Sequence, residues 1–184
     1  MAVAQPSLLT KEDYRLLPVG GPRYQLIEGE LYMAPAPNRY HQTVSRNIEF
    51  LLLKYLEKHP IGELYDAPFD VYLSEHDVLQ PDIVFVKKEN AKVLTDAGIE
   101  GTPDFVVEIL SPSDAYLDKK AKLRVYARCG VAELWLVDPD TQTLQVLHLR
   151  RDGAKPSATY GQDDTFASPH FPGIKISGRT VFKR

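Results

Sequence analysis

Glu108 is the residue of this sequence that points most directly to chemistry, because it lies inside the apolar run 105–110. A carboxylate among apolar side chains loses its hydration and either becomes protonated or needs compensation. A cation, a metal ion or a group of hydrogen-bond donors must therefore face Glu108.

A second acid, Asp82, follows Pro81 and precedes the apolar stretch 83–86. Mg²⁺ prefers one or two carboxylates together with water and substrate phosphate, so two acids on neighbouring strands can share one divalent cation. Two simpler interpretations stay open. A Pro-Asp pair often belongs to a turn, and a glutamate in an apolar strand often pairs with lysine or arginine.

Residues 114–128 form a basic element, with five Lys or Arg and two Asp, a net charge of +3. At helical spacing, polar and core-like side chains share one side of it: Asp118, Lys122, Val125, Tyr126 and Cys129. A simple Asp118–Lys122 pair explains the charges equally well, and a second apolar stripe at 116, 123 and 127 competes for the buried face. The charge run is either a solvated helix face or a phosphate-facing patch in which Lys119, Lys120 and Arg124 contact nucleic acid.

The other reactive side chains form no recognised motif. The histidines at 41, 59, 76, 148 and 170 lack metal-ligand spacing. His41 opens a predicted helix and can reach a site there, although a capping or surface role also fits. Cys129 fits a small hydrophobic residue, and Gly20-Gly21 belongs to no phosphate-binding loop.

The elements that must position these residues follow from periodicity and breakers. Thr10 caps a short helix, residues 40–58 form an amphipathic helix, and a second helix runs from Ser113 or Asp114 to about Cys129. Strands are predicted over 24–27, 31–33, 71–73, 83–86, 105–110, 133–137 and 143–149, and the last 35 residues favour strands and turns. This order predicts an α/β protein of the α+β type, with a mixed sheet and few helices.

Length and composition indicate one ordinary globular domain. The chain has 184 residues, of which 43% are hydrophobic and 26% charged, with a net charge of −3. These values exclude disordered, collagenous and coiled-coil chains, and they predict a single domain, 1–184, whose residues 1–9 are a loose N-terminal extension. A single cysteine and the lack of a membrane span or secretory signal indicate the cytoplasm. The acidic net charge gives no support for non-specific nucleic-acid binding.

Several segments together resemble the Uma-two family, small bacterial proteins regarded as endonucleases of the PD-(D/E)xK, restriction-endonuclease-like superfamily. They are Tyr24-Gln-Leu-Ile-Glu-Gly-Glu-Leu31, Pro81-Asp82, Pro103-Asp-Phe-Val-Val-Glu-Ile-Leu-Ser-Pro-Ser113, Asp118-x-x-x-Lys122 and Tyr126-Ala-Arg-Cys-Gly-Val-Ala-Glu-Leu-Trp-Leu-Val-Asp-Pro139. The resemblance extends from Tyr14 to Ile176, and it is most specific between Pro103 and Pro139.

The resemblance implies a restriction-endonuclease-like core, a central mixed β-sheet flanked by two main helices. It places Asp82 and Glu108 as ligands of Mg²⁺ or Mn²⁺, with the Ile109 carbonyl as a further ligand. Leu110 stands where the superfamily has its lysine, and the family pattern points to Lys122 on the following helix instead. The residues Glu30, His41 and Asp118 are then expected as accessory site residues.

The function implied is a metal-dependent endonuclease that hydrolyses phosphodiester bonds in nucleic acid, with DNA as the expected substrate. A homodimer is plausible because cutting both strands of a duplex needs two active sites, and no membrane association is expected. The alternative is a catalytically inactive nuclease fold that serves as a structural or interaction module, with Glu108 and Lys122 forming a buried ion pair.

Overall fold

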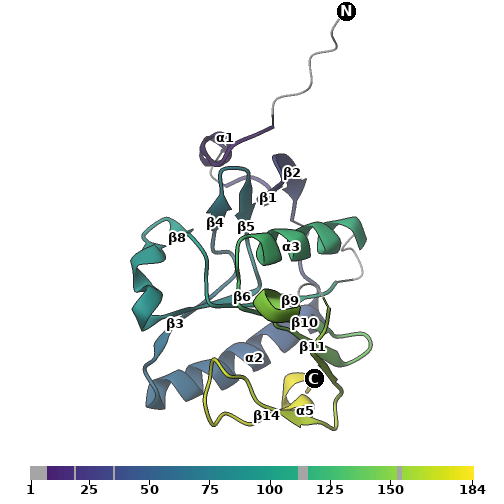
Figure 1. Ribbon diagram of the computed structural model, residues 1–184. Helices are drawn as coiled ribbons and strands as arrows, with labels where there is room; N and C mark the ends of the chain where they lie inside the picture. Colours follow the sequence, from purple (N-terminus) through teal and green to yellow (C-terminus); the bar gives the residue numbers. More distant parts are fainter. Residues whose placement is uncertain (1–7, 19, 35, 112–115, 153–154) are drawn as a thin grey trace, which may run out of the picture.

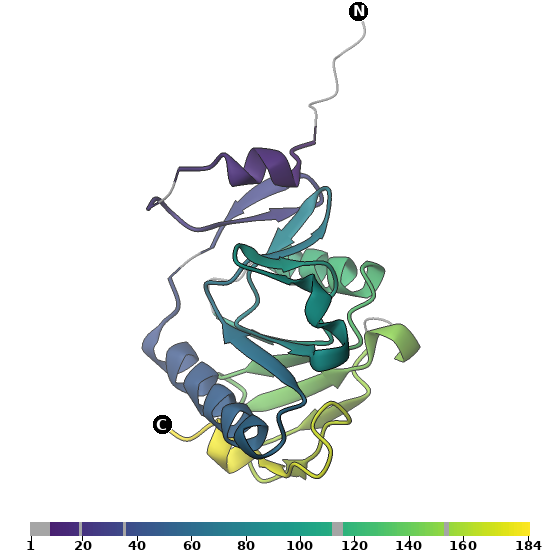
Figure 2. The same cartoon turned by 90° about the vertical axis from the view of Figure 1, so that its left-hand side faces the viewer.

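The computed structural model describes residues 8–18, 20–34, 36–111, 116–152 and 155–184, apart from the side chains of residues 116–119 and 151–152. Its main elements are two six-stranded sheets and two long helices, shown in two views in Figures 1 and 2. The α+β class predicted from the sequence is confirmed, and a second six-stranded sheet and a two-stranded sheet accompany the predicted mixed core sheet in the described residues.

One sheet, called the core sheet here, has the strand order β12-β11-β10-β9-β6-β3. Its strands are β3 (Gly62–Asp66), β6 (Ile83–Lys87), β9 (Phe105–Ile109), β10 (Glu133–Asp138), β11 (Thr143–Leu147) and β12 (Ala158–Tyr160). Strands β9 and β10 are parallel and the other pairs are antiparallel. Parallel neighbours need a long crossover, which α3 (Tyr116–Arg128) provides.

The two long helices pack against different side chains of the core sheet. Helix α2 (Arg39–Lys58) shares a hydrophobic cluster with Phe105, Val107 and Ile109 of β9, whereas α3 shares another cluster with Val106. Side chains alternate along a strand, so Glu108 points to the same side as Val106, toward α3. This alternation places the acid of β9 opposite the basic helix.

The second sheet, called the N-terminal sheet here, has the order β2-β1-β5-β4-β8-β7. Its strands are β1 (Tyr24–Ile27), β2 (Glu30–Met33), β4 (Val71–Ser74), β5 (Asp77–Leu79), β7 (Leu94–Thr95) and β8 (Gly98–Glu100). Ile27 and Leu79 of this sheet belong to the same hydrophobic cluster as Val125 of α3. Helix α3 is therefore buried against both sheets, which fixes the direction of its side chains.

The shorter elements complete the described chain. They are α1 (Lys11–Arg15), the 3-10 helix η1 (Lys88–Val93), α4 (Leu149–Asp152), α5 (Gly178–Val181), β13 (Thr165–Phe166) and β14 (Ile176–Ser177). Thr10 caps α1 as predicted. The strand expected over 143–149 ends at Leu147, and α4 begins at Leu149.

Some expectations fall on residues that the structure leaves undescribed. The predicted cap of α3 at Ser113 or Asp114 lies outside the described residues, as does most of the extension over 1–9. No helix in the described part of the chain is long and apolar enough to cross a membrane.

Candidate active site

Glu108 is held by two side chains of α3. Lys122 Nζ donates to its Oε2 at 3.1 Å, and the Tyr126 hydroxyl donates to its Oε1 at 2.5 Å. The Glu108 and Lys122 side chains are only 13% and 14% exposed. Burial raises the pKa of Glu108, the charge of Lys122 opposes this effect, and the charge of Asp82 adds to it. The lysine thus gives the buried acid the cation that its apolar surroundings demand.

Asp82 lies one residue before β6, and the pairing of Ile83 with Val107 brings it to β9. Its Oδ2 accepts a hydrogen bond from the backbone N–H of Ile109 at 2.6 Å. The residue that follows Glu108 is therefore bonded to the second acid, and both carboxylates line one cavity. The bond also fixes the orientation of the Asp82 carboxylate.

His41 approaches the same place from the first turn of α2. Asn38 caps this helix by accepting from the His41 backbone N–H at 2.9 Å. The His41 Nε2 atom lies 3.0 Å from the Ile109 carbonyl oxygen and 3.4 Å from Asp82 Oδ1. His41 is buried, so the surface role considered for it is wrong, and Asn38 supplies the helix cap.

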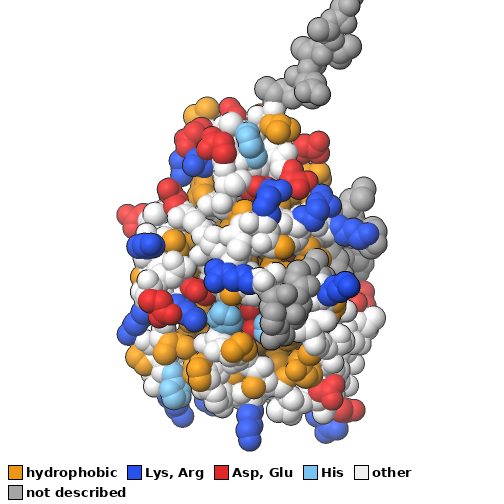
Figure 3. Space-filling model, in the orientation of Figure 1, with side chains coloured by type: hydrophobic (Ala, Val, Ile, Leu, Met, Phe, Trp, Pro, Cys, Tyr) orange, Lys and Arg blue, Asp and Glu red, His pale blue; other side chains and the backbone are white. Residues whose placement is uncertain are grey.

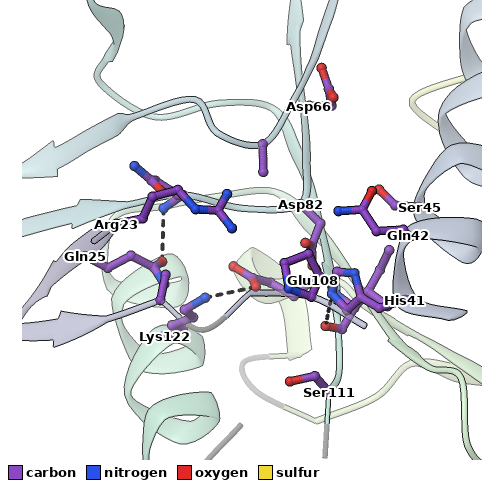
Figure 4. A pocket seen from close by; sticks show the side chains of 15 residues that line it. Arg23, Gln25, His41, Gln42, Ser45, Asp66, Asp82, Glu108, Ser111 and Lys122 are labelled. Atoms are coloured by element: carbon purple, nitrogen blue, oxygen red, sulfur yellow. Dashed lines mark hydrogen bonds and ion pairs between the residues drawn. The ribbon is translucent and has the colours of Figure 1, made fainter. Parts of the chain in front are cut away.

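These side chains surround one cavity of about 110 Å³. Figure 4 shows Asp82, Glu108 and His41 facing one another, with Lys122 on the side of α3 and Arg23 and Gln25 approaching from the N-terminal sheet. Gln42 and Ser45 of α2, Asp66 and Ser111 also line it. Both sheets and both long helices thus contribute to a cavity with acids at its centre.

The family model described as "Uma2: Putative restriction endonuclease" matches residues 11–179 of this chain. The chain belongs to the Uma2 family. Among curated proteins, no match to the chain was found.

A solved structure similar to this Uma2 chain is titled as a putative nuclease belonging to DUF820 from Anabaena variabilis ATCC 29413. The TM-score is 0.77 at 21% sequence identity, and the match covers 95% of this chain and 97% of the other. At this identity the similarity establishes the shared fold, and it confirms the nuclease-like fold predicted from the motifs.

The site residues of a metal-dependent Uma2 nuclease were predicted as Asp82, Glu108, Lys122 and the Ile109 carbonyl, and the structure brings all four together. The carbonyl of Ile109 faces His41. Leu110, which replaces the usual lysine, packs at the edge of the cluster that includes α3. Lys122 reaches the acid from that helix instead.

Of the other predicted residues whose side chains the structure describes, His41 lines this cavity, and Glu30, Lys120 and Arg124 do not. Glu30 is exposed on β2, where it accepts a 3.0 Å hydrogen bond from Tyr32. Arg124 pairs with Glu28 at 3.0 Å, and Lys120 is exposed. The side chains of Asp118 and Lys119 lie outside the described part of the chain. Figure 3 shows that lysine and arginine side chains over α3 are interspersed with acidic ones.

The sequence interpretation missed Arg23 and Gln25, which line the cavity beside Glu108. Arg23 directly precedes β1 and Gln25 is the second residue of that strand, so at a spacing of two in extended chain their side chains point to the same side. Polar residues at alternating positions of a strand that continues into buried Leu26 and Ile27 were the available signal. This alternation does not indicate which other element of the fold the side chains of Arg23 and Gln25 approach.

The donor atoms fit Mg²⁺ or Mn²⁺. Two carboxylates and a backbone carbonyl are oxygen donors of the kind that these ions prefer, and Mg²⁺ commonly uses only one or two protein carboxylates. No cluster of three or more His, Cys, Asp or Glu side chains in the described residues is close enough to hold a metal. The site therefore suits an ion that keeps water and binds substrate phosphate, and it does not suit a closed structural zinc site.

Proposed function

We propose that this protein is a metal-dependent endonuclease that hydrolyses phosphodiester bonds in DNA. The observation that carries the proposal is the buried Glu108–Lys122 pair beside Asp82 in one cavity. An isolated surface pair would say nothing about function, but these three groups are held by backbone and side-chain bonds in an accessible cavity. Such clusters of constrained acids are typical of functional sites.

The side chains of the chain divide the chemistry between them. Asp82, Glu108 and the Ile109 carbonyl would hold Mg²⁺ or Mn²⁺. When bound there, the ion would supply Lewis acidity toward the phosphate and would lower the pKa of a water bound to it. Lys122, already beside Glu108, orients the attacking water or stabilises the charge that develops on the phosphate. His41 holds the Ile109 carbonyl and Asp82 in position.

The test is cleavage of a supercoiled plasmid by the purified protein with Mg²⁺ or Mn²⁺. Asp82→Asn and Glu108→Gln are expected to lower the rate at least about a hundredfold, and EDTA should stop the reaction. Asp163→Asn is the matched control, because Asp163 is an exposed acid that pairs with Arg179 on the surface. Cleavage that persists in Glu108→Gln or in EDTA would contradict the proposal. An RNA substrate in parallel tests the preference for DNA.

A duplex substrate also bears on assembly and location. Each cavity is built from one chain and cuts one strand, so we expect a homodimer to be the species that cuts both strands. Sedimentation with and without a duplex oligonucleotide measures this.

The cytoplasm remains the expected compartment, where nucleic acid and a reduced Cys129 are both available.

One observation favours a second function, that of an inactive interaction module. Both carboxylate oxygens of Glu108 already accept hydrogen bonds from protein groups, and Leu110 stands where the superfamily has a lysine. Such a network is satisfied without an ion and needs no chemistry. Calorimetry separates the two functions: Mn²⁺ binding that Asp82→Asn abolishes supports the enzyme, and no binding supports the module.

A further inference from the structure

Arg23, directly before β1, brings a positive charge to the cavity in addition to that of Lys122. In Figure 4 its guanidinium extends over Glu108 toward Asp82. The side chain is half-buried, and the backbone around it is fixed. The Arg23 carbonyl accepts from the Ala34 N–H at 2.8 Å, and Tyr14 donates to the next carbonyl, that of Tyr24, at 2.9 Å.

The guanidinium of Arg23 has no hydrogen bond or ion pair with any residue that the structure describes. The two arginines of α3 already have acidic partners. Arg124 and Arg128 both pair with Glu28, and Arg128 also pairs with the buried Asp77. An arginine is always charged and presents five N–H donors that match a phosphate group. Arg23 therefore has donors to offer to a ligand in this cavity.

The charges of the cavity indicate which ligand this is. Of the charged groups that line the cavity, Asp66 is exposed to solvent, and the inner ones, Asp82, Glu108 and Lys122, together carry one net negative charge, which a divalent ion would turn into one positive charge. Arg23 adds another. A phosphodiester has one negative charge, and attack by hydroxide gives a phosphorane with two, so the cavity with Arg23 matches the transition state better than the ground state.

Arg23 also lies between the cavity and a neighbouring groove. Together with Gln80 it lines both the cavity and a second groove of about 470 Å³. Tyr14, Tyr24 and Tyr72 contribute to this groove, whose volume is in the range of small-molecule pockets. A phosphate held at Arg23 would thus belong to a strand with room to continue on the other side.

We infer that Arg23 binds the phosphate of the substrate strand at the cleavage site. The inference rests on the proposed nuclease function and adds to it a residue, next to β1 of the N-terminal sheet, that contacts substrate. It assigns substrate binding to the residue before β1 rather than to the exposed Lys120 and Arg124 of α3, because those lie on a surface where acids are interspersed.

The inference is tested by measuring DNA affinity in the Asp82→Asn variant, which is expected not to cleave the DNA. Arg23→Gln in that background should lower affinity for a short duplex about tenfold and reduce the slope of log affinity against log salt by about one. Arg23→Lys should restore part of the affinity because it keeps the charge. Arg179→Gln, which removes an arginine paired with Asp163, is the control and should leave the slope unchanged.

Two further measurements separate this inference from the proposed function. In the otherwise wild-type chain, Arg23→Gln should leave Mn²⁺ affinity within about twofold and lower the cleavage rate about a hundredfold. If the wild-type chain cleaves DNA and Arg23→Gln cleaves and binds equally well, the Arg23 inference alone is overturned. If the wild-type chain neither binds Mn²⁺ nor cleaves, the proposed function fails and the inference fails with it.

Discussion

The Tyr126 hydroxyl lies 2.5 Å from Glu108 Oε1, so a residue in the last turn of α3 fixes an acid near the end of β9. Tyr126 is fully buried, and its ring packs in the cluster that joins α3 to both sheets. The orientation of the acid is therefore coupled to the packing of the helix. A carboxylate that must present its oxygens to an ion benefits from such constraint.

Tyr126→Phe is expected to lower the free energy of unfolding by about 1–2 kcal/mol, because Glu108 Oε1 loses a donor in a buried place. The substitution keeps the ring, so packing is preserved. Urea unfolding measures the change, with Tyr65→Phe as a control, since the Tyr65 hydroxyl bonds to Glu63 at an exposed position. Equal stability of Tyr126→Phe and wild type would show that the short bond contributes nothing.

Lys122→Met is expected to destabilise the fold by about 2–4 kcal/mol, because it leaves the Glu108 charge buried without its cation. Adding Glu108→Gln should recover most of this loss, since the double variant buries no charge. Cleavage should be lost in both variants. Urea unfolding of the four proteins gives the coupling energy. A double variant no more stable than Lys122→Met would argue against a direct ion pair.

The pH dependence of stability should carry the signature of Glu108. Burial raises the pKa of Glu108 above its ordinary 4.5, so the native state holds a proton that the unfolded state releases. Stability due to this group is therefore present below about pH 4.5 and is lost as pH rises through the folded pKa. The stability difference between wild type and Glu108→Gln should fall over this window. A constant difference would mean that the pKa is not raised.

His41→Ala is expected to weaken Mn²⁺ binding about 10- to 100-fold, because Asp82 and the Ile109 carbonyl lose the group that positions them. Calorimetry measures the affinity directly. His59→Ala serves as a control from the exposed end of α2. Unchanged affinity in His41→Ala would limit His41 to packing.

The sequence was sufficient for the elements with strong periodicity. The apolar strand around Glu108 and the stripe of α3 that contains Lys122, Val125 and Tyr126 are both confirmed, because burial imposes these patterns directly. The helix predicted over 40–58 is α2. The pairing of Asp82 with Glu108 was predicted from their positions beside two apolar strands, and the resemblance added their expected roles as metal ligands.

Features made by contacts between distant segments escaped prediction. Strand β5 (Asp77–Leu79) is a three-residue strand whose buried Asp77 bonds Arg128, 51 positions away. Glu133 is fully buried and accepts from Trp135 and Ser168, whereas the sequence shows only an acid at the start of a strand. The position of Arg23 likewise depends on how the N-terminal sheet meets the core sheet.

The cavity takes residues from position 23 to position 122 and needs α3 seated against both sheets. During synthesis, Asp82 and Glu108 are therefore made before Lys122 and Tyr126, the two residues that hold the Glu108 carboxylate. No complete centre exists until the helix after β9 has emerged and docked. The proposed activity therefore requires synthesis of the chain to have passed α3.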